Sequence, residues 1–276
     1  MSSRAVVFAG GGVAGISWML GLVDGLTRAG VDLAGADLIS GTSAGSCVAT
    51  NLATGAVAEA CARQRRPSAE IVVPFDIDQF LDTVARHKRE APSEAEALVR
   101  IAAMEPIGPS ITPAERGAVI EARLPVHEWP ERPLKAVCVD AGSGELLALD
   151  RDSGFGLVDA VASSCALPGI WPPREVDGRT YVDGGIRSLS NIDVAAGHDR
   201  VLIVVPTALS DSVRASHQAE IAALGEAATH LIAADEASLA ALGSNPLDPD
   251  HREPALEAGQ AQAPRELDAL AAFWQR

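Results

Sequence analysis

A serine placed between two glycines is the first feature of this sequence that could carry out chemistry. The residues Gly41-Thr42-Ser43-Ala44-Gly45 follow an apolar run and precede a segment of helical character. At a sharp strand-to-helix turn this spacing exposes the serine hydroxyl, and the small flanking residues let the strand and the helix approach closely. Ser43 is therefore a candidate nucleophile, although G-x-S-x-G also arises by chance in turns rich in Gly and Ser.

A second candidate is the glycine stretch from Gly10 to Gly15, GGGVAG, which follows a strand-like run and opens a helix. It satisfies the G-x-G-x-x-G pattern of dinucleotide-binding proteins, which also need an acidic residue at the end of the next strand. Asp37 lies instead at the beginning of that strand, and no G-K-[ST] follows for a phosphate loop. Glycines at a helix N-terminus expose backbone N–H groups to negative charge, so Gly10, Gly11 and Gly12 could form an oxyanion hole.

A nucleophilic serine needs a base, and an aspartate fits better here than a histidine. Asp183, in the stretch YVDGGI, ends a short strand-like run and precedes Gly184 and Gly185, which would fix the carboxylate beside a tight turn. Taken alone, Asp-Gly-Gly is equally a plain hairpin signal. The histidines lie in helical, loop or tail contexts, at positions 87, 127, 198, 217, 230 and 251.

The elements that would position these residues alternate between strands and helices. Two strand-turn-helix units in the first 60 residues predict a parallel sheet with right-handed crossovers. Because parallel strands end on the same side of a sheet, the glycine stretch and Ser43 are expected to lie close together. We predict strands at 4–9, 36–40, 134–140, 145–149, 180–182 and 201–206, and helices at 16–29, 44–59, 157–164 and 216–227. The run 230–234 closes the alternation, and a terminal helix ends in Phe273 and Trp274.

The length and composition predict one α/β domain over residues 1–276, a three-layer sandwich with a mainly parallel central sheet flanked by helices. Hydrophobic residues make up 47% of the chain and aromatic residues only 4%, as is typical of helices packed on a buried sheet. The core is expected over 4–206, with an α/β extension over 207–276. A helical insertion over 66–124, with helices near 77–87, 93–104 and 113–122, either forms the wall of an acyl pocket or caps a sheet edge. Trp18, Leu167 and Trp171 could line an acyl channel.

The charge and the cysteines exclude several other functions. A net charge of −15 disfavours nucleic acid as a partner. It also disfavours binding to an anionic membrane through a basic patch, with Arg63–Arg66 as a local exception.

The location and the redox state are also indicated by the sequence. No apolar window is long enough to span a bilayer, and the apolar stretch at the N-terminus is too short for a secretory signal, so we expect a cytoplasmic location. The four cysteines contain no C-x-x-C pair, which favours free buried thiols and gives no support for a metal site.

Taken together, the blocks Gly10–Gly15, Gly41–Gly45 and Asp183–Gly185 resemble the patatin-like phospholipase family. The stretch SSCALPGIWPP, from Ser163 to Pro173, is similar to that family's A-x-x-x-P-x-x-F-P-P region. The resemblance covers about residues 4–206, and the blocks together are far more specific than any one of them.

The resemblance implies a lipid acyl hydrolase, a carboxylic ester hydrolase that acts on lipids or small esters without a cofactor or metal. It implies Ser43 as the nucleophile, Asp183 as the base and the amides of Gly11 and Gly12 as the main oxyanion donors, with a transient contact to a membrane surface. The family usually carries Arg or Lys where this chain has Ala14, so one positive charge is missing. A non-catalytic or acyl-transferring lipid-binding protein remains an alternative, and so does a dinucleotide-binding oxidoreductase.

Overall fold

The computed structural model describes residues 2–68, 70–106, 111–208 and 211–274, and within them the strands form one eight-stranded sheet. The strands pair in the order β5-β6-β3-β2-β1-β7-β8, and β4 also pairs with β3. Their bounds are β1 Arg4–Phe8, β2 Leu38–Thr42, β3 Leu134–Asp140, β4 Leu146–Leu149, β5 Arg174–Val176, β6 Arg179–Asp183, β7 Arg200–Val205 and β8 Ala228–Ala233. The contiguous strands β3, β2, β1, β7 and β8 run parallel, while β4, β5 and β6 are antiparallel to their partners.

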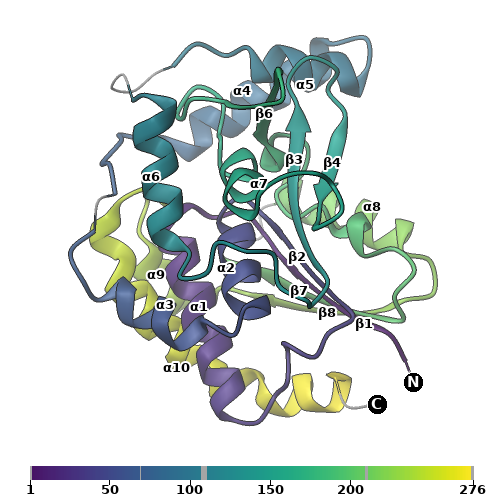
Figure 1. Ribbon diagram of the computed structural model, residues 1–276. Coiled ribbons are helices and arrows are strands. Elements are labelled where there is room, and N and C mark those ends of the chain that lie inside the picture. The colour runs from purple at the N-terminus through teal and green to yellow at the C-terminus, as the bar shows by residue number, and fades with distance from the viewer. Residues whose placement is uncertain (1, 69, 107–110, 209–210, 275–276) are drawn as a thin grey trace.

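Helices cover both faces of this sheet, which makes the three-layer α/β fold predicted from the sequence (Figure 1). The helices are α1 Gly12–Arg28, α2 Ala44–Ala53, α3 Val57–Gln64, α4 Ile77–Glu90, α5 Glu94–Ala102, α6 Pro113–Arg123, α7 Leu157–Ser164, α8 Asp211–Ala223, α9 Glu236–Leu242 and α10 Arg252–Trp274. Three short 3-10 turns lie at η1 Gly184–Ile186, η2 Ile192–Ala195 and η3 Pro249–His251. None of the helices in the described residues is long and apolar enough to cross a membrane.

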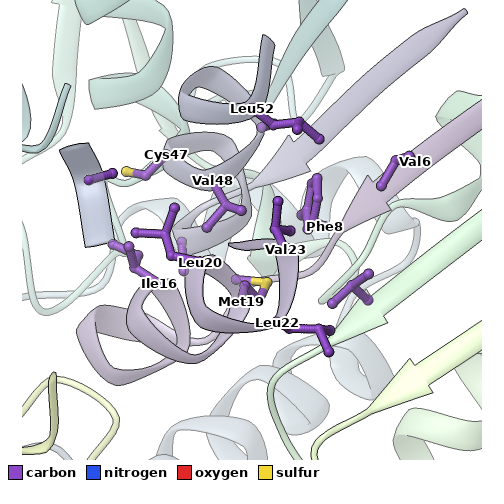
Figure 2. Close-up of a cluster of buried hydrophobic side chains, with 14 of the residues drawn as sticks. Val6, Phe8, Ile16, Met19, Leu20, Leu22, Val23, Cys47, Val48 and Leu52 are labelled. Atoms are coloured by element: carbon purple, nitrogen blue, oxygen red, sulfur yellow. The ribbon is translucent and has the colours of Figure 1, made fainter. Parts of the chain in front are cut away.

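Strand β1 shows why two layers of helix are needed. Val6 and Phe8 point into the core formed with α1, α2 and α10, whereas Ala5 and Val7 point into the core under η2 and α8. This alternation follows the period of two of a strand, and apolar residues on both sides require cover on both faces. Figure 2 shows the first core, in which Phe8 lies among side chains of α1 and α2.

Several predicted boundaries differ from the structure for identifiable reasons. Helix α1 begins at Gly12 rather than residue 16, so Gly12 and Gly15 lie in its first turn and Gly11 is its N-cap. The predicted helix 44–59 is two helices, because Gly55 at φ +74° ends α2 before α3 starts at Val57. Strand β2 continues through Gly41 and Thr42, which places Ser43 directly at the strand end. The sequence prediction missed β5 and α9.

The C-terminal helix is an integral part of the fold rather than a tail. Helix α10 packs along α1 and buries Ala255, Leu256, Ala263, Leu270 and Trp274 in the same core as Phe8. Its polar residues also bind the rest of the chain, since the Trp274 indole N–H donates to the Asp32 carbonyl oxygen at 2.8 Å.

The predicted insertion splits into two parts. Helices α4 and α5 place Val84, Leu98 and Ile101 against Val139 of β3 and Val182 of β6. Helix α6 lies beside α7, and its Ile120 belongs to the same core as Ala44 and Cys47 of α2.

Candidate active site

Ser43 occupies a strained turn between β2 and α2. Its φ of 54° and ψ of −120° lie in a region that non-glycine residues rarely adopt, which is the backbone geometry that lifts a serine side chain out of such a turn. The turn is possible only because its flanking residues are glycines. A Cβ at Gly41 would lie 2.1 Å from the Gly45 carbonyl oxygen, and a Cβ at Gly45 would lie 2.1 Å from that of Phe8.

The register of the sheet brings the end of β2 to the end of β6. Along β3, Thr42 pairs with Val137 and Asp183 pairs with the next residue, Cys138. Strand β4 pairs with both Val137 and Cys138, and a strand has only two edges, so β2 and β6 share the other edge. Ser43 and Asp183 therefore lie close together, at the point where the ends of two strands of opposite direction meet on one edge of β3. The sequence analysis considered only parallel strands here and did not predict this arrangement.

The Asp183 carboxylate is buried and only half satisfied. Its Oδ1 accepts the Gly185 N–H at 2.7 Å, while Oδ2 has no hydrogen-bond partner among the described residues. Burial raises the pKa of Asp183 to about 7, and the neighbouring Cys165 adds to this rise. Three groups lower the pKa and so limit the rise: the Ser43 hydroxyl, the Gly185 N–H and the charge of Arg116. A carboxylate with a pKa near 7 beside a hydroxyl is suited to accept its proton at neutral pH.

The glycine loop lies against the serine, and two of its N–H groups make no hydrogen bond within the part of the chain that the structure describes. A Cβ at Gly10 would lie 3.6 Å from the Ser43 Cβ, which places the loop and the elbow side by side. The Gly10 N–H donates to the Leu189 carbonyl oxygen at 2.8 Å, so it is not available to an oxyanion. In the described residues no acceptor faces the N–H groups of Gly11 and Gly12 at the start of α1. The structure therefore does not support the prediction that Gly10 donates to the oxyanion, and Gly10 only positions the loop beside Ser43.

Two polar residues that the sequence analysis did not single out hold the serine turn in place. The Ser164 hydroxyl accepts the Ser43 N–H at 2.9 Å and donates to the Val137 carbonyl oxygen at 2.7 Å. The buried Asn191 amide donates to the Thr42 hydroxyl and to the Gly184 carbonyl oxygen, both at 3.1 Å. Asn191 thus joins the residue before Ser43 to the residue after Asp183. Neither residue has a sequence signal, because serines and asparagines are common in turns.

The other candidates named from the sequence lie in apolar clusters or make their own hydrogen bonds. Trp18 is fully buried in the core formed with α1. Trp171 and Leu167 lie in a second apolar cluster with Val73 of the insertion and Leu247. The buried His217 bonds Ser190 at 2.8 Å, and no histidine among the described residues bonds Ser43 or Asp183.

The C-terminal segment also contacts the glycine loop. The Pro246 carbonyl oxygen accepts the Ala14 N–H at 3.1 Å, and it lies 2.4 Å from the position of a Cβ at Gly12. Leu247 joins this segment to Trp171. The C-terminal extension therefore contacts the glycine loop, and Leu247 connects it to the apolar cluster that contains Trp171 and Val73 of the insertion.

Comparison with known proteins agrees with this architecture. The family model described as patatin-like phospholipase matches residues 6–196. Among solved structures, the chain is similar to human GIVD cytosolic phospholipase A2, solved with methyl gamma-linolenyl fluorophosphonate, with a TM-score of 0.51 and 12% identity over 99% of this chain and 58% of that one. It is also similar to VipD from Legionella pneumophila, with a TM-score of 0.49 and 18% identity over 97% of this chain and 67% of that one. Comparison with curated protein sequences gives no match.

Proposed function

This chain belongs to the patatin-like phospholipase family, and from that premise we propose that it is a serine acyl hydrolase that cleaves carboxylic esters of lipids through Ser43 and Asp183. The observation that carries the proposal is the junction on β3, which joins a strained serine turn to a buried aspartate. The family typically hydrolyses carboxylic esters, and the roles of Ser43 and Asp183 and the lipid substrate are the parts that we propose for this chain.

In the proposed reaction, the Asp183 carboxylate accepts the Ser43 proton as Oγ attacks the ester carbonyl carbon. The N–H groups of Gly11 and Gly12 stabilise the oxyanion that forms, and Asp183 returns the proton to the departing alkoxide. Water then attacks the acyl-serine with Asp183 again as the base, which releases the carboxylic acid and regenerates the hydroxyl. Donors that are held in place before the reaction need no rearrangement as the oxyanion forms, which is the physical source of the acceleration.

The experiment is a panel of chromogenic esters of increasing acyl chain length, assayed beside a phospholipid. We expect turnover by the native chain and its loss in Ser43→Ala and Asp183→Asn, both checked for folding by circular dichroism. Ser163→Ala is the matched control, because this buried serine precedes Ser164 and its hydroxyl donates to the Asp159 carbonyl oxygen of its own helix. Turnover retained by Ser43→Ala contradicts the proposal, and a native chain without turnover favours a lipid-binding protein.

A further inference from the structure

The loop from Arg187 to Asn191, which joins η1 to η2, contacts each of the three parts of the proposed active site. Its Leu189 carbonyl oxygen accepts the N–H of the first glycine in the glycine loop at 2.8 Å. Its Asn191 side chain donates to Thr42, the residue before the nucleophile, and to the carbonyl oxygen of Gly184, the residue after the base. A shift of this loop would therefore disturb the oxyanion donors, the nucleophile and the base together.

The conformation of the loop depends on hydrogen bonds within it. Asn191 has φ 47° and ψ 51°, in the left-handed region that residues other than glycine seldom adopt. The Ser188 hydroxyl accepts the N–H groups of Ser190 and Asn191, both at 3.2 Å. Arg187 also donates to the Asn191 side chain at 2.9 Å. The Ser188 hydroxyl is thus the internal support of the loop, and its own proton needs an acceptor to keep it in place.

Helix α8 provides that acceptor from outside the site. The Glu220 carboxylate accepts the Ser188 O–H at 2.6 Å through Oε1 and the Ile192 N–H at 2.7 Å through Oε2, so it holds both ends of the loop. His217, which is buried one turn earlier on the helix, bonds the Ser190 hydroxyl at 2.8 Å. Hydrogen bonds to a carboxylate are stronger than those between neutral groups, which makes Glu220 the principal anchor.

We propose that Glu220 is a positioning residue for ester hydrolysis: by holding the loop 187–191, it keeps the glycine loop, Ser43 and Asp183 in their reactive arrangement. This inference rests on the proposed acyl hydrolase function and adds a residue that the proposed mechanism does not use. Glu220 acts through the loop from α8, which packs against η2 on the face of the sheet opposite to α1 and α2. A displacement of reacting groups by about 1 Å can cost about a hundredfold in rate, so a distant anchor can control kcat.

The first test separates kcat from KM with a chromogenic ester of short acyl chain. Glu220→Ala should lower kcat by about ten- to a hundredfold and change KM less than about threefold, because the loop holds the reacting groups. Glu220→Gln should fall between the native chain and Glu220→Ala, since its amide oxygen can accept one of the two hydrogen bonds. Ser216→Ala is the matched control. The Ser216 hydroxyl donates to the same carboxylate at 2.9 Å from within α8, so its loss should leave kcat unchanged.

A second control separates positioning from stability. Trp274→Phe removes the hydrogen bond to the carbonyl oxygen of Asp32, which precedes β2 and so lies at the opposite end of that strand from Ser43. Both Trp274→Phe and Glu220→Ala should lower the melting temperature, but only Glu220→Ala should lower kcat at temperatures where both variants are folded. A native kcat in Glu220→Ala, or an equal loss of kcat in Trp274→Phe, would overturn the proposal.

The third test measures the loop without turnover, by hydrogen exchange of the Gly10 N–H, which is protected by its bond to Leu189 and can be followed by NMR. Glu220→Ala should speed this exchange about tenfold, while Trp274→Phe and Ser216→Ala should leave it unchanged. Unchanged exchange in Glu220→Ala would overturn the proposal, and so would faster exchange with a native kcat. A native chain that hydrolyses no ester contradicts the proposed function instead, and the exchange rates then still decide whether Glu220 holds the loop.

Discussion

Replacing Asp183 by asparagine should make the protein more stable at neutral and alkaline pH while it removes turnover. Burial raises the pKa of this carboxyl from 3.8 to about 7 in the folded chain. A group with a raised folded-state pKa contributes stability that is fully present at low pH and lost as pH rises to that pKa. Asparagine resembles the protonated form, and its Oδ1 still accepts the Gly185 N–H, so Asp183→Asn does not undergo this loss.

The size of the effect follows from the two pKa values. At about 1.4 kcal/mol for each pKa unit, the difference corresponds to about 4 kcal/mol of unfolding free energy. The variant and the native chain should be about equally stable near pH 4, and the variant should gain steadily up to about pH 7 and hold its advantage above it. The assay is urea unfolding followed by circular dichroism at intervals of pH.

Asp140→Asn is the matched control, because Asp140 ends the neighbouring strand and its pKa is displaced the other way. Burial alone would raise the pKa of Asp140, but hydrogen bonds from Ser143 and Gly142 and the charge of Arg179 hold it below its usual value. Asp140→Asn should therefore be less stable than the native chain at pH 8. The reasoning is refuted if Asp183→Asn is less stable than the native chain at every pH, since Asp183 would then be an ordinary structural carboxylate.

Three other consequences can be measured with a chromogenic ester and an unfolding assay. The rate of ester hydrolysis should rise with pH through an apparent pKa of about 7, because the base acts only when deprotonated, and a rate that falls over this range would contradict Asp183 as the base. Gly11→Ala should lower kcat about a hundredfold, because its methyl group would lie 2.3 Å from Pro206 Cγ and displace an oxyanion donor. An unchanged kcat would show that Gly11 does not take part in the reaction. Ser164→Ala should cost about 1–3 kcal/mol of stability and lower kcat, because the Ser43 N–H and the Val137 carbonyl oxygen lose their hydrogen-bond partner. A wild-type kcat would show that the Ser43 turn keeps its geometry without the Ser164 hydroxyl.

Much of the fold could be predicted from local pattern. The β-branched run before Gly10 and the helical spacing after it identify β1 and α1, and the same pattern identifies β2 and α2. The errors have two causes. The break between α2 and α3 has a local signal in Gly55, which a continuous helical pattern on both sides of it obscured. The short edge strand β5, in contrast, is defined by its pairing with β6 and not by a local pattern.

The site residues could likewise be predicted only in part from the sequence. Ser43 and the glycines carry their own signals, since a tight turn and a close backbone approach permit few residue types. Ser164 and Asn191 carry none, because their importance comes from contacts with residues far away in the chain, such as Ser43 for Ser164 and Thr42 for Asn191. Their side chains could be placed at the site only by the three-dimensional arrangement of α7 and the loop after β6.

The central claim is that the Ser43 hydroxyl is an activated nucleophile, and covalent labelling tests it most directly. The intact chain is treated with an alkyl fluorophosphonate, and the modified peptide is identified by mass spectrometry. We predict a single adduct on Ser43, formed much more slowly in Asp183→Asn and absent in Ser43→Ala. A native, folded chain that forms no adduct, or forms it on another residue, would contradict the account.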